Sequence, residues 1–94
     1  MKLRISGNSL RLRLTRSEVE EFAATGSYGN SIELGDGSLA YRLERTEGTS
    51  LTASLSGNTI KVSVPAAEAD QWTASDDVGI EAPDNGGLKI VIEK

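Results

Sequence analysis

Six basic side chains in the first half of the chain have the types and spacing best suited to chemistry, namely contact with phosphate groups. Four of them alternate with apolar residues in two short runs, so that both runs direct charge to the same face of a sheet. Clustered Lys and Arg are the usual electrostatic signature of nucleic-acid contact. The competing interpretation, which we favour, is a solvated outer face that deters edge pairing. The six are Lys2, Arg4, Arg11, Arg13, Arg42 and Arg45.

Catalytic chemistry has little support in the sequence, because the chain contains no His and no Cys. These residues are the commonest general base and the commonest activated nucleophile. The remaining carboxylates, Lys and Ser form no recognisable catalytic or phosphate-binding motif. We therefore predict that the protein is not an enzyme and needs no cofactor.

A site for a hard cation is the other chemistry that the sequence raises. Asp76 and Asp77, with Asp84 or Asp36, supply the carboxylates that such a cation prefers. Aspartates at helix ends and hairpin turns commonly bond nearby backbone amides instead. We predict no metal site.

Length and composition indicate one compact domain over residues 1–94. The chain has 94 residues, 37% hydrophobic and 26% charged, which is typical of a globular protein with one core. The opening residues lack the apolar region of a secretory signal and no apolar run is long enough to span a bilayer, so we expect a soluble cytoplasmic protein. The net charge of -4 lies wholly in residues 48–94, and residues 1–47 are neutral and richer in Arg. An acidic chain argues mildly against a polyanion as its main partner.

An internal repeat determines the predicted architecture. Residues 5–24 align without a gap on residues 55–74, with five identities among twenty pairs, including "SGN" at 6–8 and 56–58. The match continues from Ile32 on Ile80 and from Leu39 on Leu88, with slips after the predicted helix and inside the predicted hairpin turn. We therefore divide the chain into repeats 1–45 and 51–94, joined by 46–50.

Each repeat has the pattern strand, strand, helix, strand, strand. Leu10, Leu12 and Leu14 alternate with Arg residues, as do Ile60, Val62 and Val64 with polar ones. "TRSE" at 15–18 is a capping-box signature, and Pro65 suits the first turn of the second helix. The buried helix faces are predicted to be Val19, Phe22 and Ala23 in the first repeat, and Ala69, Trp72 and Thr73 in the second.

The remaining signals are turns. "GDG" at 35–37 and "DNGG" at 84–87 are typical of hairpin turns, and Gly7-Asn8 and Gly57-Asn58 are predicted to form tight turns at positive φ. These dipeptides need no ligand to explain them, because Gly is the residue that adopts positive φ without strain.

One such repeat of about 45 residues is too small to bury an adequate core alone. We therefore predict a mainly β fold with two short helices, in which the duplicated units form a pseudo-twofold, closed or nearly closed barrel of about eight strands. Because the chain supplies both copies, we expect a monomer.

The two repeats resemble known units. "GNSLRLRLTRSEVEEF" with "SIELGDGSLAYRLE", and "TIKVSVPAAEADQW" with "DDVGIEAPDNGGLKIVIEK", look like the swapped-hairpin barrel of AbrB-type regulators and MazE-type antitoxins. In those proteins two chains intertwine into one barrel, and several members bind DNA. Over its whole length, from "MKLRISGNSLRLRLTRSEV" to "VPAAEADQWTASDDVGIEA", the chain also resembles a small bacterial family of uncharacterised proteins.

The expected function is a non-catalytic binding or scaffolding module with a protein partner. The alternative is an AbrB-like nucleic-acid-binding regulator that uses the arginine-rich face of the first repeat. Ser54 and Ser63 replace Arg4 and Arg13 in the second repeat, so the basic face is not repeated. Nucleic acid is therefore the less favoured ligand, and no membrane association is expected.

Overall fold

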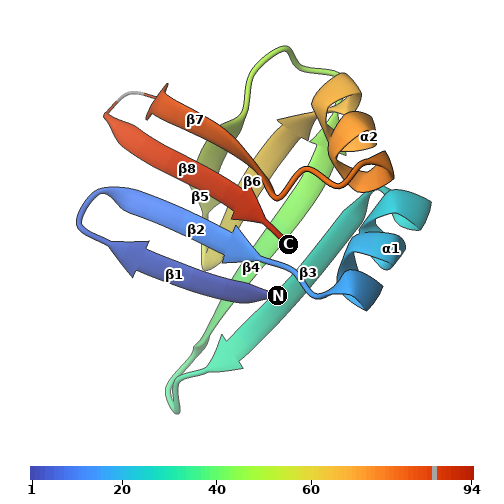
Figure 1. Cartoon of the computed structure of the whole chain (residues 1–94). Coiled ribbons are helices and arrows are strands. Elements are labelled where there is room, and N and C mark those ends of the chain that lie inside the picture. Colours follow the sequence, from blue (N-terminus) through green and yellow to red (C-terminus); the bar gives the residue numbers. More distant parts are fainter. Residues whose placement is uncertain (86) are drawn as a thin grey trace.

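The fold consists of two four-stranded sheets and two helices, in a computed structural model that describes residues 1–85 and 87–94, with the side chains of 83–85 left aside (Figure 1). The first sheet has the order β1-β2-β8-β7 and the second the order β3-β4-β6-β5. The elements are β1 (Lys2–Ser6), β2 (Ser9–Arg13), α1 (Arg16–Thr25), β3 (Ser27–Glu33), β4 (Ser38–Thr46), β5 (Thr52–Ser56), β6 (Thr59–Pro65), α2 (Ala66–Ala74), β7 (Gly79–Asn85) and β8 (Leu88–Glu93).

Each half of the chain contributes one hairpin to each sheet. The β1–β2 hairpin joins the β7–β8 hairpin through the parallel pair β2 and β8. The β3–β4 hairpin joins the β5–β6 hairpin through the parallel pair β4 and β6. Both halves have the predicted order strand, strand, helix, strand, strand, and each four-stranded sheet contains one hairpin from each half.

The registers of the two sheets correspond along the repeat. Lys2 lies opposite Arg13 in the first hairpin, and Thr52 lies opposite Ser63, fifty residues further on in both strands. Leu12 pairs with Ile92 across one parallel junction and Val62 with Leu43 across the other. Gaps in the sequence match therefore fall outside the central strands.

The two "GN" turns are also equivalent in structure. Gly7 and Gly57 have φ of 56° and 58°, as the sequence predicted. The Asn8 side chain donates to the Gly87 carbonyl at 2.5 Å, and the Asn58 side chain donates to the Ser38 carbonyl at 2.9 Å. Each asparagine therefore joins its turn to the hairpin contributed by the other half, which gives these residues a structural role.

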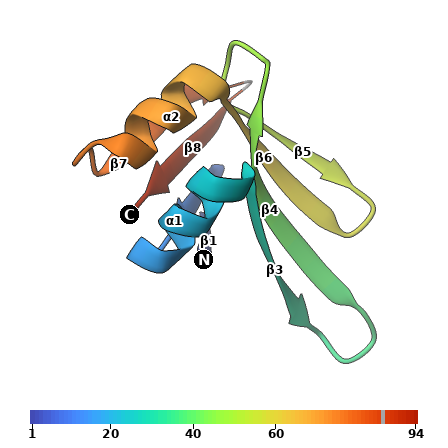
Figure 2. The same cartoon turned by 90° about the vertical axis from the view of Figure 1, so that its right-hand side faces the viewer.

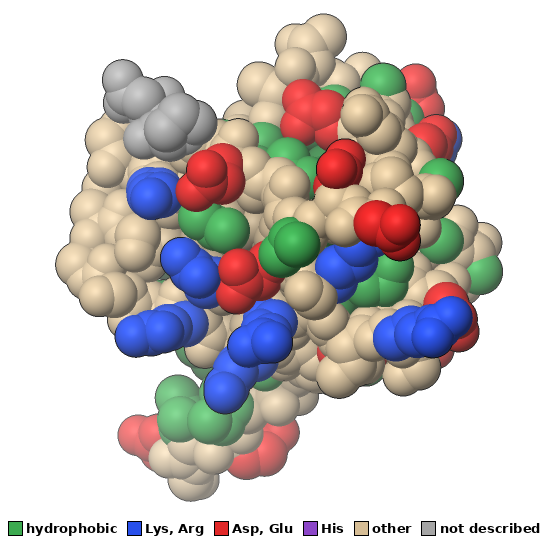
Figure 3. Space-filling model, viewed as in Figure 1, with side chains coloured by type: hydrophobic (Ala, Val, Ile, Leu, Met, Phe, Trp, Pro, Cys, Tyr) green, Lys and Arg blue, Asp and Glu red, His purple; other side chains and the backbone are tan. Residues whose placement is uncertain are grey.

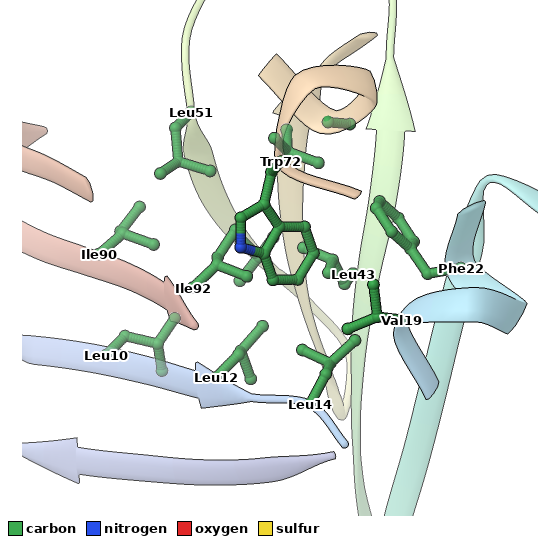
Figure 4. Packing of buried hydrophobic residues seen from close by; sticks show 13 residues of the cluster. Leu10, Leu12, Leu14, Val19, Phe22, Leu43, Leu51, Trp72, Ile90 and Ile92 are labelled. Carbon is green, nitrogen blue, oxygen red and sulfur yellow. The ribbon is translucent and has the colours of Figure 1, made fainter. Parts of the chain in front are cut away.

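One hydrophobic core contains residues from both halves (Figure 4). Trp72 of α2 lies at the centre of this core with 2% of its surface exposed. The Trp72 ring packs edge to face against the Phe22 ring of α1, with 6.2 Å between the ring centroids. The Trp72 indole N–H donates to the Val78 carbonyl, and the Lys94 ammonium lies 5.4 Å from the indole ring. The alternating strand residues Leu10, Leu12, Leu14, Val62 and Val64 are buried with Phe22 and Trp72, and Ile60 is partly buried.

The helices pack side by side at one end of the sheets, as Figures 1 and 2 show. Helix α1 has the predicted capping box between Thr15 and Glu18, and it ends at Gly26 with φ of 84°. The pKa of Glu18 is lowered to about 2, mainly by the hydrogen bond from the Met1 ammonium and then by the Thr15 backbone amide. The capping box orders the first turn of α1, and the ion pair between Met1 and Glu18 holds that turn beside the start of the chain.

Three sequence predictions need correction. Ala23 is exposed, because α1 is covered on one narrow stripe by Val19 and Phe22 only. Pro65 ends β6 and stands at the N-cap of α2 instead of in its first turn. The "DNGG" turn includes residue 86 and side chains outside the described residues, and β7 extends to Asn85 with a register shift after Ala82.

The predicted barrel is not closed by backbone pairing. Among the described strands, every ladder lies within one of the two sheets, so β1, β7, β3 and β5 are edges. At the beginning of β1 the contact between the sheets is made by a side chain, because the Tyr41 hydroxyl donates to the Met1 carbonyl at 3.3 Å. The described strands therefore form two four-stranded sheets around a common core and no closed barrel.

We predict that Trp72→Ala destabilises the protein more than truncation of any other aromatic residue. Loss of a buried Trp typically costs about 3–5 kcal/mol, a large share of the roughly 5–15 kcal/mol that keeps a domain folded. Denaturant unfolding measures the cost, and Trp72→Phe, which keeps a ring at the site, is expected to cost less. A melting temperature lowered by only about 2 °C in the Ala variant would contradict the central position of Trp72.

Candidate functional site

The outer face of the first sheet collects four of the six predicted basic residues. Lys2 and Arg4 lie on β1, and Arg11 and Arg13 lie directly opposite them on β2. Their side chains line a surface hollow of about 400 Å³. Lys89 of β8, on the same face beside Ser9, adds a fifth cation, and Figure 3 shows the positive side chains gathered over these strands. We call Lys2, Arg4, Arg11, Arg13 and Lys89 the basic face.

Acidic residues neutralise this face only in part. Glu93 lies 3.3 Å from the Arg11 guanidinium, and Glu81 lies 3.8 Å from the Lys89 ammonium. Lys2, Arg4 and Arg13 form no ion pair with any residue whose side chain is described. Cations directly opposite each other on neighbouring strands repel, so this arrangement costs stability.

The other two predicted basic residues lie elsewhere. Arg42 is on β4 of the second sheet, where it pairs with Glu44 at 3.2 Å and bonds the Ser27 hydroxyl. Arg45 makes two hydrogen bonds of 2.9 Å to Asp70 of α2. This contact raises the pKa of Arg45 and lowers that of Asp70. Arg42 and Arg45 therefore have internal carboxylate partners and do not extend the basic face.

A second feature, which the sequence did not predict, is an apolar groove between the two sheets. Ile5 of β1 and Leu55 of β5 are 60% and 72% exposed, although Leu10, opposite Ile5, belongs to the core and Ile60, opposite Leu55, packs against it. The groove has a volume of about 320 Å³. Its apolar lining consists of Ile5, Leu10, Ala53, Leu55, Ile60 and Leu88, and we call it the apolar groove.

The groove exists because the helices cover only one end of the sheets (Figure 1). Ile5 and Leu55 continue the inward alternation of their strands, as their pairing with Leu10 and Ile60 shows. The alternation in the sequence does not indicate that the sheets leave these two side chains uncovered. The only available signal was that Ile5 and Leu55 align in the repeat and precede the two "GN" turns.

Other polar clusters do not make a site. No group of three His, Cys, Asp or Glu residues suited to a metal ion occurs among the described residues, and Asp84 lies outside the described side chains. Arg16, Glu20, Asp76 and Lys94 line a hollow beside the two helices. The Lys94 ammonium already has hydrogen-bond partners within the chain, since it donates to the carbonyls of Trp72 and Ser75 at the end of α2.

Comparison with known proteins identifies the family. The model of a family of unknown function, DUF7009, matches residues 1–94. The chain belongs to this family. DUF7009 membership confirms the resemblance to a family of uncharacterised proteins, and no comparison supports the likeness to AbrB or MazE. No curated protein and no solved structure matches the chain.

The described residues also include no helix that is long and apolar enough to cross a membrane.

Proposed function

We propose that the protein is a non-catalytic, monomeric binding module that takes a protein segment in the apolar groove. The observation that carries this proposal is the exposure of Ile5 and Leu55, two large aliphatic side chains that line the same depression as the core residue Leu10. Isolated exposed apolar side chains are normal on a protein surface. Two of them joined to the core by a continuous apolar lining are typical of an interaction site.

The size of the groove favours a peptide segment. Full burial of an aliphatic side chain contributes about 1.5–3 kcal/mol, so covering what is exposed of Ile5 and Leu55 supplies roughly 2–4 kcal/mol. That free energy corresponds to a dissociation constant of about 1 mM or weaker. A physiological ligand therefore has to gain affinity outside the groove, and a polypeptide can do so through its backbone and its neighbouring side chains.

The matched registers support the duplication that we propose for the fold. The parallel junctions, the turn glycines and the Asn8 and Asn58 contacts all repeat about fifty residues apart. A twofold unit of this kind corresponds to the swapped-hairpin arrangement of the AbrB resemblance, with both copies on one chain. Because each hairpin already has its partner, the proposal includes a monomer.

Absence of catalysis is part of the same proposal. The groove is lined by aliphatic residues, and the polar residues beside it are Asn8, Ser9 and Ser54. Asn8 is held in its turn by the contact with Gly87. The groove lining contains no titratable side chain that could act as a base toward either serine.

Selection of peptides from a displayed library against the full chain tests the groove. Enriched peptides are expected to bind the wild type and to lose about tenfold in affinity to Leu55→Ser or Ile5→Ser, as expected when apolar contacts worth about 1.4 kcal/mol are lost. Val78→Ser is the matched control, because Val78 is 66% exposed and lies outside the groove. Failure to enrich any peptide, or equal binding to all variants, would contradict the proposal.

Nucleic-acid binding is the second candidate, because Lys89 brings a cation from the second half to the basic face. Affinity for DNA rises with the number of phosphates that are neutralised, and Glu81 and Glu93 oppose two of the five cations.

We therefore expect random and genomic duplexes to bind more weakly than about 10 μM near physiological salt, without sequence preference. Fluorescence anisotropy measures this, with the triple substitution Arg4→Ala, Arg11→Ala and Arg13→Ala as the control. Submicromolar, sequence-dependent binding that the triple variant abolishes would favour the regulator instead.

A further inference from the structure

We infer that the partner segment binds as an added strand along β1, with apolar side chains toward the apolar groove and acidic side chains toward the basic face. This inference rests on the proposed binding function and specifies the chemistry of the partner. It depends on the position of β1, which borders both surfaces: Ile5 lines the groove, and Lys2 and Arg4 lie on the opposite face of the same strand.

Strand β1 has a free edge. It pairs with β2 on one side, and no described strand pairs with its other side. Because the hydrogen-bonding groups of an antiparallel strand alternate between its two sides, every second residue of β1 directs its N–H and C=O away from β2. Extended peptides commonly bind such an edge through main-chain hydrogen bonds, with alternate side chains in pockets.

The other three edge strands, β5, β7 and β3, are less suited to pairing with an acidic strand. Residues of β5 equivalent to Lys2 and Arg4 are Thr52 and Ser54, which carry no charge. The edge strand β7 has a register shift after Ala82, and irregularities of this kind disrupt pairing. On β3 the outward row ends in Glu33 and is not basic. An acidic strand is therefore complementary to β1 alone among the four edges.

The charges on β2 distinguish a ligand-binding role of the basic face from a role that only prevents edge-to-edge pairing. A Lys or Arg on the edge strand is enough to deter pairing with another copy. Here Arg11 and Arg13 on the inner neighbour double the charge, opposite Arg4 and Lys2. Like charges directly opposite are destabilising, so the second row has a cost that edge protection does not require. An anionic ligand that lies along β1 removes this repulsion.

The same row of charges disfavours a second copy of the chain as the occupant. Two β1 strands aligned antiparallel about Leu3 would set Lys2 of each copy opposite Arg4 of the other. An acidic segment meets no such repulsion. Its apolar side chains, on the opposite face of the added strand, would lie beside Ile5 and cover the part of that side chain that the fold leaves exposed.

The test uses the full chain and a synthetic peptide of nine alternating Val and Glu residues, blocked at both ends. Binding is expected to shift the backbone amide signals of β1 and the groove in NMR spectra. Affinity should fall roughly tenfold between low and high salt, because exposed ion pairs are screened. A peptide with Lys in place of Glu, and one with N-methyl groups on alternate residues, should bind at least about tenfold more weakly, since they lose the charge match and the backbone donors respectively.

The variant Arg4→Ser, which introduces the residue found at position 54, is expected to reduce binding several-fold without lowering the melting temperature. Lys61→Ser is the matched control, since Lys61 is exposed on β6 of the second sheet and carries the same charge away from β1. Equal binding of the Lys or N-methyl peptide, shifts confined to another edge, or no binding of the Val and Glu peptide would overturn the inference. If the affinity of library peptides depends on Leu55 but not on Arg4 or on the salt concentration, the groove function is supported and the added strand is overturned.

Discussion

The parallel pairing of β2 with β8 and of β4 with β6 is the constraint on which the rest of the structure depends. Each junction joins a hairpin of one half to a hairpin of the other, so neither sheet exists until both halves have met. A unit of about 45 residues buries too little surface to fold alone. The core follows from the same junctions, because Leu12 and Ile92, and Val62 and Leu43, are paired across them.

The candidate site is a consequence of this arrangement. Both helices pack at one end, where Phe22 and Trp72 meet, and no further element of the part of the chain that the structure describes covers the other end. The inner faces of β1 and β5 therefore remain partly open at Ile5 and Leu55. The repeat makes the two sheets alike in backbone but different in charge, since Arg4 and Arg13 of one correspond to Ser54 and Ser63 of the other. The two hairpins thus have matching registers but different charges.

Sequence reasoning recovered the local structure well, because turn, cap and alternation signals are local. The capping box at Thr15 and Glu18, the turn glycines and the inward Leu10, Leu12 and Leu14 are all confirmed. It placed Arg42 and Arg45 with the basic face, although β4 belongs to the other sheet and Arg45 bonds Asp70. It missed Lys89 and the groove for the same reason, because both depend on which hairpins lie side by side.

Native-state hydrogen exchange tests the central claim most directly, namely that the two halves fold as one unit. Amides of β2, β4, β6 and β8 are expected to exchange only through global unfolding, with one common free energy that equals the stability from denaturant unfolding. Trp72→Phe should lower that free energy by the same amount in strands of both halves. Two distinct values, one for residues 1–45 and another for residues 51–94, would show that each half holds its own core and would contradict the account.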